Sequence, residues 1–268
     1  MHTLLARCCA VALVAVTTSA AGPRDVLSRA RQLYNGADYD GAIETAGRAT
    51  VSPDVADAAR LVLARAYLER FRRDGNDDDR NAAREALKQV RPAQLSEDDR
   101  VELVIALGES LYFDDQAGAA AEQFELALAH VERRQTARRE RLLDWWATAL
   151  DRQAQASSDS VARAIQTRIV RRMEEELRTD AGATVASYWL AAAARGAGDI
   201  ERAWDAAIAG WVRVSQLGSR GAAARTELDA LVTQAIIPDR ARVISPNSPD
   251  QIAASMRSQW DALKKAWS

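Results

Sequence analysis

The feature that most constrains this chain is the spacing of its apolar residues, which recur with the period of an α-helix in segment after segment. In the first segment one helical face holds Val26, Leu27, Ala30, Leu33 and Tyr34. Similar patterns cover residues 39–49, 55–72, 79–90, 98–113, 117–131, 138–153, 158–178, 183–196, 199–216 and 219–236. No stretch of useful length alternates apolar and polar residues as a β-strand does. The sequence therefore predicts an all-α protein.

The composition agrees with helices and argues against a nucleic-acid partner. The chain has 13 glycines and 6 prolines, and its commonest residues are strong helix formers. Prolines fall between the apolar segments, and three of them crowd residues 238–249. The net charge is −2, whereas a protein that follows phosphates usually carries a clear positive excess.

The amino-terminal residues have the pattern of a secretory signal peptide. Arg7 precedes the apolar run Cys8 to Val16, and the small residues Thr17 to Ala21 follow. The run is shorter than the roughly 20 residues that cross a bilayer. We expect residues 1–21 to be removed, no integral membrane span to remain, and the mature protein to be periplasmic or outer-membrane-associated. The alternative is a buried first helix.

Metal and cofactor chemistry is not expected. The only cysteines are Cys8 and Cys9, and they would be removed with the signal peptide. His2 would be removed as well, so His130 would be the one histidine of the mature protein. A single histidine cannot form a multi-histidine zinc site. The sequence predicts no cofactor and no metal.

A resemblance to a known family appears in the turn between the first two helices. The stretch Tyr34-Asn-Gly-Ala-Asp-Tyr-Asp-Gly-Ala-Ile-Glu44 resembles the helix-turn-helix of tetratricopeptide repeats, whose period is about 34 residues. The small and core positions of that family are matched in repeat one by Ala30, Ala42, Ala46 and Ala49, in repeat three by Gly108, Ala120, Phe124 and Ala127, and in the fifth pair by Ala191, Ala203, Ala207 and Gly210. Later pairs are spaced by about 41 to 44 residues, longer than that period, and the fourth pair is degenerate.

The resemblance implies a right-handed α-solenoid of antiparallel helix pairs over residues 22–237; a generic helical bundle is the alternative. Residues 238–249 are predicted to be a linker and residues 250–268 a capping helix. Ser248 with Pro249 is typical of a helix start. An apolar stripe suited to covering the last pair comprises Ile252, Met256, Trp260, Leu263 and Trp267.

In the family that this chain resembles, the first helices of the pairs line a concave groove that holds a partner segment. Transferred by position, the partner-binding residues are Arg31, Tyr34, Asn35, Arg65, Leu68, Glu69, Glu109, Tyr112 and Phe113. Trp146 is a further candidate, because its position in the first helix of its pair faces the same surface and aromatic residues are enriched at interfaces.

Three other patterns favour structural interpretations. Asp74, Asn76 and Asp78 are spaced like calcium ligands, but Asp79 stands where an EF-hand loop needs glycine, so a solvated acidic loop is expected. The basic cluster from Arg133 to Arg141 is interleaved with acids at helical spacing and is expected to be a solvated, paired face. The Glu174–Glu176 run is interpreted in the same way.

The sequence therefore predicts a non-enzymatic scaffold of the bacterial cell envelope that binds a protein or peptide. One alternative is a cell-wall lytic enzyme, because Gly108-Glu109-Ser110 resembles the glutamate-serine motif of lytic transglycosylases; Glu109 would then be the general acid, if burial raised its pKa. The other alternative is a helical subunit of an outer-membrane assembly or secretion complex.

Overall fold

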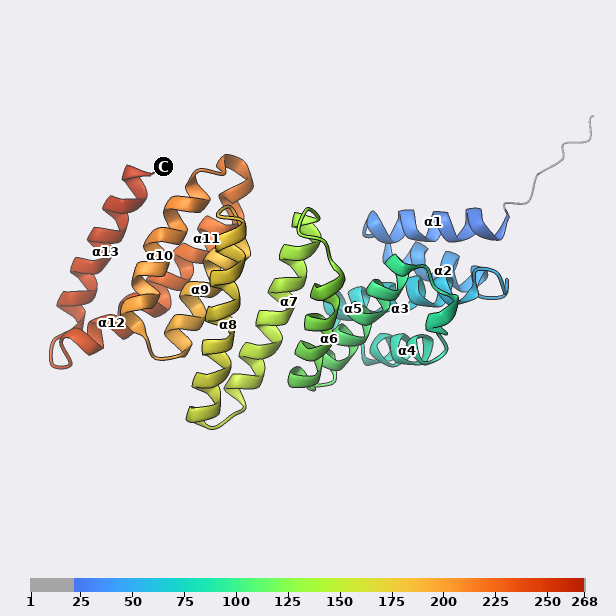
Figure 1. Cartoon of the computed structure of the whole chain (residues 1–268), viewed down its shortest axis with the longest axis horizontal. Helices are drawn as coiled ribbons and strands as arrows, with labels where there is room; N and C mark the ends of the chain where they lie inside the picture. The colour runs from blue at the N-terminus through green and yellow to red at the C-terminus, as the bar shows by residue number, and fades with distance from the viewer. Residues whose placement is uncertain (1–21, 268) are drawn as a thin grey trace, which may run out of the picture.

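The structure, a computed structural model, describes residues 22–267, so the predicted signal peptide lies outside the described residues. The described part is helical and contains no strand (Figure 1). Its helices are α1 (Pro23–Asn35), α2 (Tyr39–Ala49), α3 (Ala56–Asp74), α4 (Asp77–Lys88), α5 (Glu97–Phe113), α6 (Ala117–His130), α7 (Thr136–Gln155), α8 (Asp159–Thr179), α9 (Thr184–Gly196), α10 (Ile200–Ser215), α11 (Ala222–Leu231), α12 (Ile237–Ile244) and α13 (Pro249–Ala266). The predicted all-α class is confirmed.

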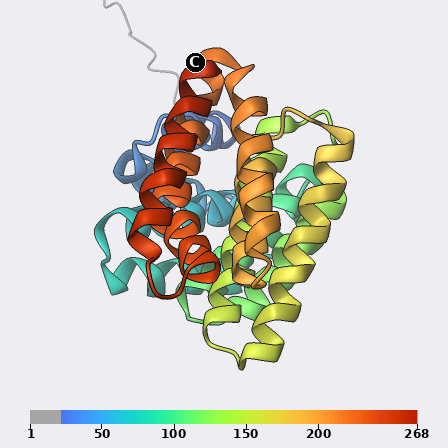
Figure 2. The ribbon, with the colours of Figure 1, turned by 90° about the vertical axis from the view of Figure 1, so that its left-hand side faces the viewer.

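Helices that follow one another in the sequence pack against one another, and they succeed each other along the long axis of the molecule (Figures 1 and 2). The first helices of successive pairs also form a row. In that row the backbones of α1 and α3, of α3 and α5, and of α7 and α9 come close together, whereas α5 and α7 approach each other less closely. The row is therefore loosest between α5 and α7.

Small residues allow the paired helices to approach. Ala30 and Ala42 are fully buried where α1 and α2 pack. Between α5 and α6, a Cβ added to Gly108 would lie 2.7 Å from Cε1 of Phe124, a distance that real Cβ atoms do not adopt. Gly108, which the resemblance places at a small position, therefore lies at a close helix contact with the Phe124 ring against it.

The carboxyl-terminal region differs from its predicted linker. Residues 232–236 form a π-helical turn, and α12 follows without a break, so helix occupies much of the range 238–249. Pro238 has no amide hydrogen and needs room in the preceding turn, which the wider π-helical turn supplies. The sequence signal for a linker came from the prolines, and the π-helical turn accommodates the first of them.

The last helix, α13, packs against α12 and covers the end of the molecule. Trp260 is fully buried, and its indole Nε1 donates a 2.7 Å hydrogen bond to Asp229. Its ring lies 5.3 Å from that of Trp211 and 6.1 Å from that of Trp204. As the sequence predicts, α13 starts at Pro249 directly after Ser248, although the Ser248 side chain makes no capping hydrogen bond.

The acidic run after α3 is ordered rather than an open loop. Asp77, Asp78 and Asp79 form the first turn of α4, where carboxylates favour the positive end of the helix dipole. Asp79 is buried and accepts hydrogen bonds of 2.6 and 2.8 Å from Arg70. Over residues 22–267, no helix has both the length and the apolar composition needed to cross a membrane.

Candidate binding cleft

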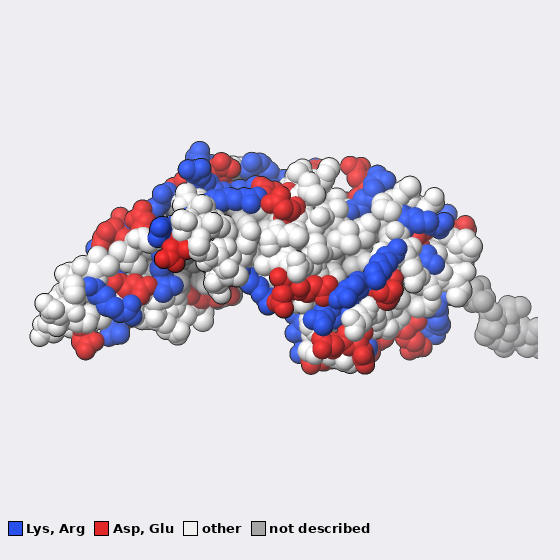
Figure 3. All heavy atoms as spheres, turned by 90° about the horizontal axis from the view of Figure 1, so that it is seen from below, with Lys and Arg blue, Asp and Glu red and all other residues white. Residues whose placement is uncertain are grey.

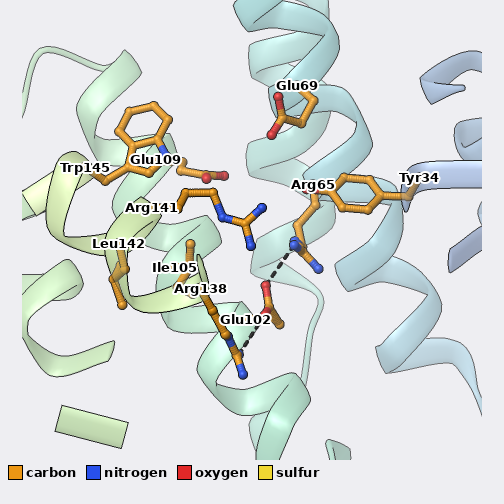
Figure 4. Close-up of a pocket in the computed structure, with 10 residues that line it drawn as sticks. All are labelled: Tyr34, Arg65, Glu69, Glu102, Ile105, Glu109, Arg138, Arg141, Leu142 and Trp145. Carbon is orange, nitrogen blue, oxygen red and sulfur yellow. Dashed lines mark ion pairs between the residues drawn. The ribbon is translucent and has the colours of Figure 1, made fainter. Parts of the chain in front are cut away.

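A small charged cleft opens on the row of first helices (Figure 4). It is lined by Tyr34 of α1, Arg65 and Glu69 of α3, Glu102, Ile105 and Glu109 of α5, and Arg138, Arg141, Leu142 and Trp145 of α7. Each contributing helix is the first of its pair. The enclosed volume is about 30 Å³, enough for one or two water molecules.

Helical spacing brings these side chains to one side of each helix. The lining residues of α5 follow one another at intervals of three and four positions, and those of α7 form the pairs 138/142 and 141/145, each four positions apart. Residues three and four apart lie on the same face of an α-helix. The cleft therefore uses one face of each of four helices, and it lies where α5 and α7 separate.

One carboxylate joins three of these helices. Glu102 forms ion pairs with Arg65 at 2.8 Å and with Arg138 at 2.6 Å. The three side chains are only about one-fifth exposed (20%, 21% and 19%), so solvent screens the pairs incompletely. Glu102 thus connects α3, α5 and α7 across the cleft.

Glu109 is the unusual residue of the cleft. Its side chain is buried (9% exposed) and makes no hydrogen bond or ion pair with any other described residue. Burial raises the pKa of its carboxyl from 4.5 to about 7, and the nearby Arg65 and Arg141 only partly oppose this. Glu69 and Glu102 add to the increase through charge repulsion. The carboxyl lines the cleft and can donate to or accept from a group that enters it.

Aromatic side chains form two walls of the cleft. The Arg65 guanidinium lies 4.5 Å from the centre of the Tyr34 ring, a cation–π distance. Burial raises the pKa of the Tyr34 phenol above its ordinary value of 10. On the other side, Trp145 packs against Phe124 with 5.6 Å between ring centres. These rings hold the charged residues in a partly dehydrated setting.

Four of the predicted groove residues line the cleft, namely Tyr34, Arg65, Glu69 and Glu109. Sequence reasoning missed Glu102, Ile105, Arg138, Arg141, Leu142 and Trp145. The last four stand at positions 138, 141, 142 and 145, a spacing that places them on one face of a helix. This spacing is a sequence signal that could have identified them as a group. The basic residues were instead interpreted as one solvated cluster.

Two predicted groove residues belong to the core. Leu68 and Trp146 are each 1% exposed and pack inside the molecule. Of the two neighbouring tryptophans of α7, Trp145 rather than Trp146 lines the cleft. One residue corresponds to about 100° around a helix, so the assignment of α7 was displaced by one position.

The remaining predicted residues lie beside the cleft. Arg31 is paired with Asp99 at 2.9 Å, and Asn35 is exposed at the end of α1. Tyr112 and Phe113 are half-buried, and both rings contact Trp145, at 5.3 and 5.9 Å between centres. They belong to an aromatic cluster that supports the cleft wall.

The predicted solvated basic face is also only partly correct. Arg139 is buried and donates hydrogen bonds of 2.8 and 2.6 Å to Glu176, which is itself buried. Arg134 is exposed and pairs with Glu132. The Arg139–Glu176 pair fastens α7 to α8, so this part of the two charge runs is structural.

The charged surface seen in Figure 3 mixes both signs, without a broad patch of either. Among residues 22–267, no group of three or more histidine, cysteine, aspartate or glutamate residues is arranged to hold a metal ion. Comparisons of the sequence with known protein families and with curated proteins give no match.

Proposed function

We propose that this chain is a non-enzymatic scaffold of the bacterial cell envelope that binds a segment of another protein. In this proposal residues 1–21 direct export, and the helix pairs form a right-handed, tetratricopeptide-like solenoid with antiparallel helices. The observation that supports it most is the cleft, to which α1, α3, α5 and α7 all contribute. Mixed charges beside aromatic rings are typical of surfaces that bind proteins.

Photo-cross-linking tests this proposal without disturbing the core. A photoreactive amino acid is placed in the full chain at position 35, exposed beside the cleft, and as a control at position 163, an exposed site on α8. In envelope extracts we expect a defined protein adduct from position 35 and none from position 163. A folded chain that forms no adduct from position 35, or equal adducts from both positions, would contradict the proposal.

A second function, cell-wall hydrolysis, is favoured by one observation. Burial raises the pKa of Glu109 to about 7, as a general acid requires. The enclosed cavity of about 30 Å³, however, is far smaller than a ligand site for a molecule such as a sugar. Release of soluble fragments from purified peptidoglycan by the full chain, lost in Glu109→Gln, would support the enzyme and overturn the scaffold.

A stable complex of fixed stoichiometry would point to the third alternative, a subunit of an outer-membrane assembly or secretion complex. Size-exclusion chromatography with light scattering, on partner-bound material purified without cross-linking, distinguishes such a complex from a transient adaptor. A persistent assembly without cross-linker favours the subunit.

A further inference from the structure

We propose that the cleft seats an acidic side chain, aspartate or glutamate, of the bound segment, between the Arg141 guanidinium and the carboxyl of Glu109. This inference rests on the proposed function and specifies the chemistry of its site. The protonated carboxyl donates a hydrogen bond to the incoming carboxylate, and Arg141 supplies the opposite charge.

The free positive charge in the cleft is Arg141. Arg65 and Arg138 are both engaged in ion pairs, because they share the Glu102 carboxylate at 2.8 and 2.6 Å and Arg138 also lies 3.8 Å from Asp98. Arg141 is exposed and forms no ion pair with any residue in the described range. In Figure 4 its guanidinium extends into the space between the Glu109 carboxyl and Arg65. It is therefore positioned to meet a group that enters from outside.

The charge balance favours an anion over a cation. The lining contains three arginines and three glutamates, so its formal charge is 3 − 3 = 0 when every acid is ionised. When Glu109 holds its proton, the balance becomes 3 − 2 = +1. Glu69 is also neutralised from outside the lining, because Arg72 donates to it at 2.6 and 2.9 Å. An incoming carboxylate lowers this positive charge, whereas an incoming cation would raise it.

The size of the cavity fits a carboxylate better than larger groups. About 30 Å³ holds one or two waters, and the two oxygens of a carboxylate occupy a comparable space. Displaced waters are replaced by direct hydrogen bonds to the protein. A sugar ring or a nucleobase requires a much larger site.

The inference makes binding depend on one proton. Glu109 must be protonated to donate, and its pKa is about 7. The charged groups that act on it are Arg65, Glu69, Glu102 and Arg141. Affinity for a carboxylate should therefore be highest below pH 7 and fall about tenfold per pH unit above it. A cationic ligand would give the opposite dependence, because it favours the ionised carboxylate.

The test uses two labelled peptides that are blocked at both ends, one of Asp-Gly repeats and one of Lys-Gly repeats. Fluorescence anisotropy of the full chain with each peptide is measured from pH 6 to pH 9. We expect the Asp-Gly peptide alone to bind, and to bind more weakly as the pH rises. Blocking the carboxyl terminus ensures that a side chain is the source of the carboxylate.

Variants separate the two contacts. Glu109→Gln keeps a hydrogen-bond donor, the side-chain amide, that cannot ionise. Its affinity for the peptide should therefore not depend on pH, and at pH 8 it should exceed that of the unaltered chain by about tenfold or more. Arg141→Ala should weaken binding about tenfold or more at pH 6. The control is Arg163→Ala, an exposed arginine of α8 outside the cleft, which should bind like the unaltered chain.

Tighter binding of the Lys-Gly peptide, affinity that rises with pH, or equal effects of the two arginine variants would overturn the inference. If position 35 cross-links a partner while the Asp-Gly peptide does not bind, the acidic seat fails and the scaffold function stands. If the peptide binds and no partner cross-links, the proposed function fails instead.

Discussion

Arg138 of α7 lies 2.6 Å from Glu102 of α5, and the other oxygen of the same carboxylate lies 2.8 Å from Arg65 of α3. The three residues come from three successive helix pairs, and they meet where the backbones of α5 and α7 are least close. A charged contact thus spans the part of the row where direct helix packing is weakest.

Replacing Glu102 tests this bridge. Glu102→Gln removes the nearest counter-charge of two partly buried guanidinium groups and leaves Arg138 only the more distant Asp98 at 3.8 Å, so we expect the free energy of unfolding to fall by about 1–3 kcal/mol. The control is Glu85→Gln, which breaks an exposed pair with Lys88 (63% and 60% exposed) and should cost about 0.5 kcal/mol or less. Urea unfolding measures both. Equal losses would show that the Glu102 bridge adds no stability.

Gly108 allows α5 and α6 to approach each other. Gly108→Ala would place its Cβ 2.7 Å from the buried Phe124 ring, and we expect a loss of about 1–3 kcal/mol from overpacking. Gly47→Ala, in α2, is the matched control, because its Cβ would meet nothing within 4 Å and alanine favours helix by about 1 kcal/mol. The two melting temperatures should move in opposite directions; a shared direction would contradict the close contact.

Glu109 should make stability depend on pH. Its pKa is 4.5 ordinarily and about 7 in the folded chain, so the folded state holds the proton more tightly. This contribution is fully present below pH 4.5 and is lost as the pH rises through 7. Over this pH range the contribution of Glu109 to the free energy of unfolding changes by about 3 kcal/mol in total.

Urea unfolding at pH 5 and pH 8 measures this effect, with Glu109→Gln as the reference. The unaltered chain should lose stability between the two pH values by about 2–3 kcal/mol more than the variant does. A difference near zero would mean that solvent reaches the Glu109 carboxyl.

Trp260 should be essential to the carboxyl-terminal end. Trp260→Ala removes a fully buried indole and its hydrogen bond to Asp229, and we expect a loss of about 3–5 kcal/mol. Trp267, on the same stripe but 43% exposed, is the control, and Trp267→Ala should cost about 1 kcal/mol or less. Similar melting temperatures for the two variants would show that α13 packs loosely.

Helix positions were largely predictable from the sequence, because they depend on local periodicity. The expected ranges 98–113 and 117–131 became Glu97–Phe113 and Ala117–His130. The contacts of the cleft were less predictable. Arg65 and Glu102 stand on different helix pairs, and their meeting depends on how successive pairs are rotated, which no local pattern contains.

The tryptophan pair shows the limit of periodicity most clearly. Trp145 and Trp146 are equally apolar, and both choices continue a helical face. Phe124 and the neighbouring aromatic rings receive Trp145, while Trp146 enters the core. Packing partners that are distant in the sequence decided the outcome.

The π-helical turn before Pro238 sets the rotational phase of everything that follows. Val232 and Ile237 are both fully buried although they stand five positions apart, and Ala241 follows four later. The extra residue of this turn is what brings Ile237, rather than the residue before it, onto the same face as Val232. Deleting one residue here would convert the turn to an ordinary α-helical turn and leave Ile237 and Ala241 on the buried face, whereas deleting two would rotate them by about 100° toward solvent. Descendants of this sequence can therefore lack the π-helical turn if a single residue is lost with it.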